Sequence, residues 1–115
     1  MTPRLTPQFA LEALKRSETS LPFVELFSHG SLSVEMYQPL VQDTQTPHAR
    51  NEVYVVVSGH GEFVNDGFRK PFQPGELLFV PAGVEHRFEN FSDDFATWVI
   101  FYGPEGGELP QQEHA

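Results

Sequence analysis

The sequence contains no cysteine among its 115 residues. This absence excludes disulfide bonds, thiolate metal sites and cysteine nucleophiles. It also fits a reducing compartment, where disulfides rarely persist. Because the first residues form no apolar segment of the kind found in signal peptides, we expect a cytoplasmic protein.

Positive charge is also scarce. The chain has 7 Lys and Arg residues against 16 Asp and Glu residues, a formal net charge of −9. Binding to nucleic acids or anionic membranes requires clustered basic residues that neutralise phosphate groups, and here the basic residues are scattered. No hydrophobic run approaches the roughly 20 residues of a membrane-spanning helix. We therefore expect no nucleic-acid partner and no membrane partner.

The length suits one domain, and the pattern of residues indicates a predominantly β structure. Thr6 can cap a helix and Pro7 fits its first turn, so the sequence predicts a single helix over residues 6–18. From residue 21, short β-like runs alternate with Gly, Pro, Asn and Asp. These runs cover residues 21–27, 32–37, 53–57, 61–64, 68–72, 76–80, 86–91 and 95–102.

Such a series of short strands and tight turns predicts an all-β barrel or double-sheet roll with one short N-terminal helix. We divide the chain into a helical segment (1–20), a β-barrel domain (21–104) and a polar C-terminal tail (105–115). The run 53–57 is apolar on both faces, which is typical of a strand that is covered on both sides. The same run is consistent with a homodimer.

Two of the five histidines lie in constrained settings. His48 follows a proline and precedes Glu52 by four residues. His86 follows the rigid turn at residues 81–83. The other three are expected to be exposed in turns or in the tail: His29, His60 and His114.

His48, Glu52 and His86 are candidate metal ligands. Four residues along one strand span about 13 Å, which is too far for His48 and Glu52 to share an ion. If Arg50 and Asn51 turn the chain, the imidazole and the carboxylate can converge. Two imidazoles and a carboxylate suit Fe, Mn, Ni, Zn or Co. A surface pair of His48 with Glu52 and a hydrogen-bonded His86 at a rim explain the same residues nearly as well.

The glycine and proline spacings resemble the two sequence motifs of the cupin superfamily. The second half of the first motif, H-x3-E-x6-G, falls on His48, Glu52 and Gly59. The second motif, G-x5-P-x-G-x2-H-x3-N, is matched at Gly75, Pro81, Gly83, His86 and Asn90. The resemblance covers roughly residues 31–103. It implies a small single-domain cupin, whose jelly-roll barrel holds one divalent transition metal (Fe, Mn, Ni or Zn).

The chain departs from the first motif at two positions. The opening glycine falls on Leu40 and the first histidine on Thr46. A threonine hydroxyl is a poor ligand for a transition metal. Gln45 through its amide oxygen, Asp43 and water are the alternatives for that coordination position, and water or Gln45 is favoured.

The resemblance also implies that the metal lies inside the barrel. Residues on the same strand faces as the ligands would then line the pocket, so Tyr54 and Phe88 are candidate substrate contacts, with ordinary core packing as the alternative. Three further pocket candidates have strand faces that the sequence does not assign: Met36, Tyr37 and Trp98.

Cupins carry out many reactions, so the fold does not fix the activity. A metal with open coordination positions in an aromatic-rich barrel favours a dioxygenase-type enzyme acting on a small apolar or aromatic molecule. The alternatives are a non-catalytic module that binds a small molecule, and a metal-dependent sugar isomerase. The isomerase would need cationic side chains inside the barrel for a phosphate, and few are available.

Overall fold

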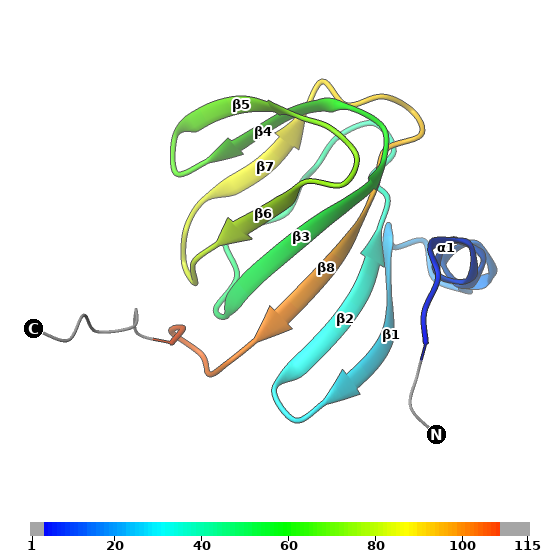
Figure 1. The fold of residues 1–115 in the computed structure, drawn as a ribbon, viewed down its shortest axis with the longest axis horizontal. Helices are drawn as coiled ribbons and strands as arrows, with labels where there is room; N and C mark the ends of the chain where they lie inside the picture. The colour runs from blue at the N-terminus through cyan, green and yellow to red at the C-terminus, as the bar shows by residue number, and fades with distance from the viewer. Residues whose placement is uncertain (1–3, 109–115) are drawn as a thin grey trace, which may run out of the picture.

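A computed structural model of the chain describes residues 4–108, which form one helix and eight strands (Figure 1). Their bounds are α1 (Pro7–Arg16), β1 (Phe23–His29), β2 (Leu32–Tyr37), β3 (Asn51–Ser58), β4 (Gly61–Asn65), β5 (Phe68–Phe72), β6 (Leu77–Val80), β7 (His86–Glu89) and β8 (Ala96–Tyr102). The predicted helix and all eight predicted runs correspond to these elements. Boundaries differ by a few residues, as at β1, which begins and ends two residues later than expected.

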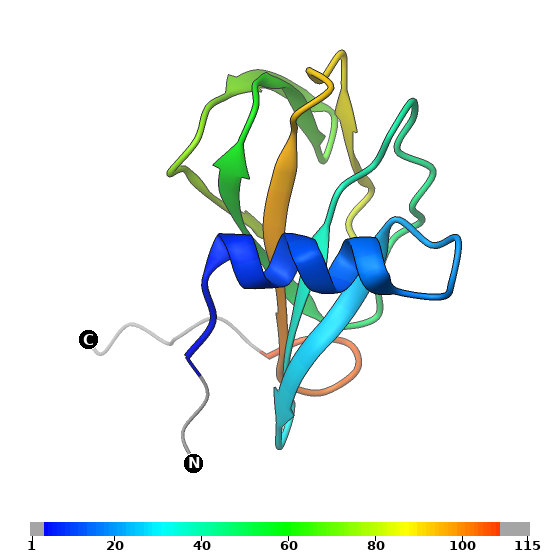
Figure 2. The ribbon, with the colours of Figure 1, turned by 90° about the vertical axis from the view of Figure 1, so that its right-hand side faces the viewer.

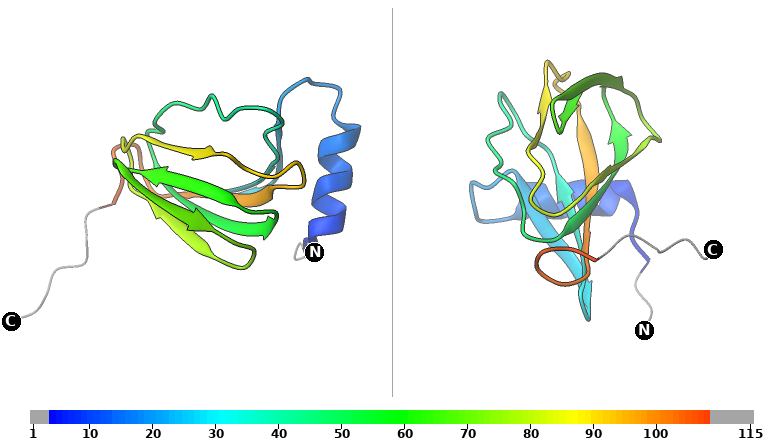
Figure 3. Two further views of the ribbon diagram at one scale, coloured as in Figure 1. Left: turned by 90° about the horizontal axis from the view of Figure 1, so that it is seen from above. Right: turned by 90° about the vertical axis from the view of Figure 1, so that its left-hand side faces the viewer.

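The strands form two antiparallel sheets that lie face to face (Figure 3). One sheet has five strands in the order β1-β2-β8-β3-β6, and the other has three in the order β5-β4-β7. The expected all-β, double-sheet architecture with one short N-terminal helix is confirmed. Among the described strands, no ladder joins the two sheets edge to edge.

Aromatic rings from both sheets fill the space between them. Tyr54 of β3 meets Phe88 of β7 with ring centroids 4.9 Å apart, and Phe88 meets Phe63 of β4 at 4.6 Å. Phe72 and Phe95 extend this cluster on the side of Phe88. Because large buried rings dominate the energetics of a small core, this cluster supplies much of the stability of the barrel.

Helix α1 covers the outer face of the five-stranded sheet (Figure 2). The hydroxyl of Thr6 accepts a hydrogen bond from the N–H of Phe9 at 3.1 Å, the expected cap. Ala10 is fully buried and packs with Met36 and Ala96. No helix within residues 4–108 is long and apolar enough to cross a membrane.

Two of the further pocket candidates do not face the space between the sheets. Met36 and Trp98 pack beneath α1 and not toward the space between the sheets. In β2 the apolar positions Val34 and Met36 therefore face the helix side, and Glu35 and Tyr37 face inward. Apolar strand positions usually point to the core between two sheets. In β2 they point outward, because α1 covers them there.

The segment between β2 and β3 differs from expectation. The sequence offered a turn at Arg50 and Asn51 as the way to bring His48 and Glu52 together, and residues 38–50 form no strand. The chain instead bends at residues 49–50 and enters β3 directly. The expected change of direction between His48 and Glu52 is thus present, one residue earlier than proposed.

Candidate metal centre

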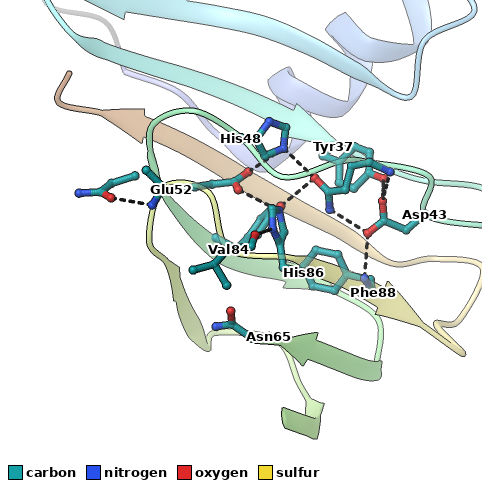
Figure 4. A network of polar contacts seen from close by, with 12 residues as sticks. Tyr37, Asp43, His48, Glu52, Asn65, Val84, His86 and Phe88 are labelled. Atoms are coloured by element: carbon teal, nitrogen blue, oxygen red, sulfur yellow. Dashed lines mark hydrogen bonds and ion pairs between the residues drawn. The ribbon is translucent and has the colours of Figure 1, made fainter. Parts of the chain in front are cut away.

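Three side chains that can bind a metal converge between the sheets (Figure 4). His48 lies just before β3, Glu52 on β3, and His86 is the first residue of β7. Nε2 of His86 lies 3.1 Å from Oε1 of Glu52, and Nε2 of His48 lies 3.8 Å from Oε2. One ligand atom from each residue lies within 4.8 Å of the other two. This spacing allows all three to bind one ion.

Two hydrogen bonds hold the segment before β3 beside the turn that leads into β7. The N–H of Gly83 donates to the carbonyl of His48 at 2.7 Å. The N–H of Ala82 donates to Oδ1 of Asn51 at 2.9 Å. Gly83 has a φ of +80°, which glycine adopts without strain. As a result the rings of His48 and His86 lie with centroids 5.3 Å apart, although 38 residues separate them in the sequence (86 − 48).

Three buried atoms of this centre have no hydrogen-bond partner among the described residues: both carboxylate oxygens of Glu52 and Nε2 of His86. Nε2 of His86 and Oε1 of Glu52 lie 3.1 Å apart, and they form an ion pair only when the imidazole is protonated. Glu52 is only 1 % exposed, and an unsatisfied buried carboxylate is costly. A divalent cation would compensate all three atoms, so the residues present fit a metal ion.

A backbone carbonyl orients the ring of His86. Nδ1 lies 2.9 Å from the carbonyl oxygen of Val84. Because a carbonyl oxygen can only accept, Nδ1 carries the proton and donates, and Nε2 turns its lone pair toward Glu52. Burial lowers the pKa of His86, but the Glu52 carboxylate and the Val84 carbonyl outweigh it and raise that pKa above its ordinary value.

Asp43 fixes which end of the Gln45 amide faces the centre. Its carboxylate accepts hydrogen bonds from Nε2 of Gln45 at 2.8 Å, from the N–H of Gln45 at 3.1 Å and from the Tyr37 hydroxyl at 2.7 Å. It also accepts from the N–H of Phe88 at 2.8 Å. With Nε2 held by Asp43, Oε1 of Gln45 faces Nε2 of His48 at 3.1 Å.

Replacing Asp43 with asparagine should lower the free energy of unfolding by about 2–4 kcal/mol, measured by urea denaturation. The side chain is 7 % exposed, and all four of its partners are donors. The NH₂ group of asparagine would face at least one of these donors and could not accept its hydrogen bond. Asp93→Asn, in an exposed turn, is the matched control and should change stability by less than about 0.5 kcal/mol. Equal effects of the two substitutions would contradict the role given to Asp43.

The centre opens into a cavity of about 380 Å³. Its walls are partly apolar and partly polar, and comprise Leu21, Pro22, Phe23, Glu35, Tyr37, Thr44, Gln45, His48, Glu52, Val99 and Phe101. Burial, followed by the nearby carboxylates of Glu25 and Glu52, raises the pKa of Glu35 to about 7. A larger cavity of about 550 Å³, bordered by β4, β5 and β6, contains none of the three metal-binding candidates.

The other predicted site residues lie at different depths. Thr46 is exposed, and Gln45 is the residue of this segment whose side chain reaches His48. Tyr54 is fully buried, and its hydroxyl donates to Oε1 of Gln45 at 3.0 Å. Phe88 is buried in the aromatic cluster and does not line the cavity. His29 and His60 are exposed as expected, and His114 lies outside the described residues.

Sequence reasoning did not identify Glu35, Phe23 or Phe101 as cavity residues. The alternation in β2 was a usable signal for Glu35, since it shares a strand face with Tyr37. Phe101 faces Glu52 in the register of β3 and β8. That pairing depends on a contact between strands far apart in the sequence, so no local pattern indicated it.

The comparison with known protein families decides the classification. The profile of the cupin domain matches residues 33–102, more than half of the chain. The chain belongs to the cupin family. The cupin barrel accounts for the two facing sheets, and the three candidate ligands lie between them.

Related sequences include an uncharacterised protein of Streptomyces coelicolor, 33% identical over 101 residues, with 84% of this cupin and 96% of the relative covered. An acireductone dioxygenase of Leishmania infantum is 31% identical over 104 residues. That match covers 75% of this cupin but only 30% of the dioxygenase.

Solved structures support the fold. A cupin 2 conserved barrel domain protein from Salinispora arenicola superimposes with a TM-score of 0.65 and 21% identity, covering 90% of this cupin and 89% of that chain. A protein from Neisseria meningitidis gives the same TM-score and identity, and covers 88% of this cupin and all of that chain. At this identity the likeness shows the shared barrel and nothing about the reaction.

Proposed function

We propose that this cupin is a metal-dependent enzyme of the dioxygenase type that acts on a small apolar or aromatic molecule. The observation that carries the proposal is the convergence of His48, Glu52 and His86 beside a cavity, where buried ligand atoms of Glu52 and His86 have no hydrogen-bond partner among the described residues. Two imidazoles and one carboxylate suit a divalent transition metal, Fe, Mn, Ni or Zn. A metal bound there would act as a Lewis acid toward a substrate oxygen and, if redox-active, would supply the chemistry of oxygen activation.

Gln45 is the proposed fourth protein ligand. Its Oε1 lies 3.1 Å from Nε2 of His48, one of the three candidate ligands. The carbonyl oxygen of an amide is neutral and binds a metal more weakly than a carboxylate does. Gln45 can therefore yield its position to water or to a substrate oxygen, while Asp43 keeps the amide oriented.

The walls of the cavity support an apolar or aromatic substrate. Phe23 and Phe101 present rings to it, and Val99 adds an aliphatic surface. Tyr54 and Phe88 stay predicted substrate contacts. Both are at most 1 % exposed, so a substrate would touch them only if the lining residues in front of them move.

The matched acireductone dioxygenase supports the dioxygenase class, within the limit that the chain spans less than a third of that protein. No Lys or Arg lines the described cavity, which disfavours the alternative of an isomerase for sugar phosphates. The alternative of a binding module predicts ligand binding without consumption of oxygen.

The proposed activity is tested by oxygen uptake. Protein loaded with Fe(II) should consume oxygen when it is mixed with catechols, and the His86→Ala variant should not. A catechol that raises the melting temperature of the loaded protein without oxygen uptake would favour the binding module. Oxygen uptake that is equal in the wild-type protein and in the variant would contradict the proposed site.

We further propose a homodimer formed through the outer face of the five-stranded sheet, beyond the part that α1 covers. Leu77 is 63% exposed and Phe79 44% exposed, and they pair in register with Val55 and Val53. Exposed apolar side chains on neighbouring strands are typical of association surfaces. Light scattering should give about twice the monomer mass of 13.0 kDa, and a strict monomer would contradict this proposal.

A further inference from the structure

Glu35 presents a carboxylate to the cavity without a partner. It lies on β2, opposite Glu25 of β1 and Val99 of β8. Glu25 accepts a hydrogen bond from the Ser33 hydroxyl at 3.0 Å. Within residues 4–108, no side chain donates a hydrogen bond to Glu35 or forms an ion pair with it. The carboxylate that lines the cavity is thus available to a ligand.

The surroundings of Glu35 are unfavourable for a charged group. Two carboxylates directly opposite each other on neighbouring strands destabilise a sheet, as Glu25 and Glu35 do here. Partial burial and a second nearby carboxylate, Glu52, add to this cost. Two arginines of the three-stranded sheet do not offset it, because Arg69 and Arg87 pair with glutamates near their own strands.

The position of Glu35 suits contact with a molecule that also reaches the metal centre. Glu35 on β2 and Glu52 on β3 lie on the same sheet, separated by β8. Two strand spacings, combined with the two-residue offset along β8 from Val99 to Phe101, correspond to about 12 Å. This is the scale of one aromatic ring with a short substituent. Phe101, which lies opposite Glu52 in the strand register, also lines the cavity and can pack against the apolar body of such a molecule.

We propose that Glu35 is a specificity-determining residue, whose carboxylate accepts a hydrogen bond from an N–H or O–H group of the substrate. This inference rests on the proposed function, because it assigns the substrate class of the same cavity. The cavity then selects molecules with an apolar body and a neutral or cationic donor group. It discriminates against carboxylates and phosphates, since its described lining carries two glutamates and neither Lys nor Arg.

The test compares two probes of matched shape, benzylamine and benzoate, by NMR titration of zinc-loaded protein. We expect the wild-type protein to bind benzylamine at least about tenfold more tightly than benzoate. In Glu35→Gln, which keeps the shape of the side chain, this preference should fall about tenfold. Glu25→Gln is the matched control: it removes the opposing carboxylate, which does not line the cavity, and should keep the preference within about twofold.

Metal content measured on the same samples separates this inference from the proposed function. Bound zinc together with equal or reversed preference in the wild-type protein would overturn the role of Glu35 and leave the metal centre intact. Bound zinc with no shift of cavity resonances by either probe would overturn it as well, as would an unchanged preference in Glu35→Gln. Failure of the wild-type protein to hold zinc would overturn the proposed function itself and the inference that depends on it.

Discussion

Replacing His86 with alanine should reduce bound divalent metal from about one equivalent to less than about a tenth. His86 contributes one of three converging ligand atoms, and its buried Nε2 has no hydrogen-bond partner within residues 4–108. Loss of an outer-shell partner alone weakens metal affinity about 10–100-fold, so the loss of a ligand should weaken it on the order of a thousandfold. Elemental analysis of untagged protein, with circular dichroism to confirm the fold, measures this.

Two further variants make the test of His86 specific. His60→Ala removes an exposed histidine in a turn and should leave metal content unchanged. Glu52→Gln keeps the size of the side chain and covers the possibility that His86→Ala does not fold. It should lose metal while the metal-free protein becomes more stable, because a neutral amide costs less to bury than a carboxylate that accepts no hydrogen bond from the described residues. Full retention of metal in His86→Ala or Glu52→Gln would contradict the assigned centre.

The Gly59→Ala substitution should lower the free energy of unfolding by about 3–5 kcal/mol. Gly59 has a φ of +84°, and a Cβ built on it would lie 2.5 Å from Cα of Phe95. The clash involves backbone, which cannot rotate away as a side chain can. Phe95 is fully buried in the aromatic cluster, so relief by movement would disturb the core. Thermal or urea denaturation measures the loss.

Gly67→Ala separates the clash at Gly59 from backbone strain. Gly67 has a φ of +83°, but nothing lies within 4 Å of its added Cβ. This variant should therefore lose only the strain of a left-handed backbone, about 1 kcal/mol. If Gly59→Ala and Gly67→Ala cost the same, the close approach between Gly59 and Phe95 does not determine the requirement for glycine.

Turn residues made much of the fold predictable. Gly75, Pro81 and Gly83 mark the two turns on either side of β6, and Gly75 and Gly83 both have positive φ. Local chemistry fixes such positions, because few other residues adopt these backbone conformations without strain. The same spacings placed His86 at the start of β7. The local sequence was thus sufficient to predict the strands and one candidate ligand.

The inward face of β2 could not be predicted in this way. Val34 and Met36 alternate with Glu35 and Tyr37, and the apolar pair would ordinarily face the space between the sheets. Here α1 covers the apolar pair from outside, so the polar pair lines the cavity. Which face of β2 points inward depends on where α1 docks. That tertiary contact cannot be predicted from the alternation of residues along one strand.

The role of Gln45 was open for a similar reason. In an irregular segment, side-chain direction follows from hydrogen bonds and not from a repeating backbone. Asp43 binds both nitrogens of Gln45 and also the N–H of Phe88, 45 residues away. The sequence could name Gln45 and Asp43 as alternatives to Thr46, but only the fold shows that Asp43 orients Gln45 toward His48.

Anomalous diffraction from crystals of the metal-loaded protein, recorded at the absorption edge of the metal, would locate the ion directly. We predict one peak within about 2.0–2.3 Å of Nε2 of His48, Nε2 of His86 and a carboxylate oxygen of Glu52. A peak at any other place, or loaded crystals without a peak among these three side chains, would contradict a metal centre in this cupin.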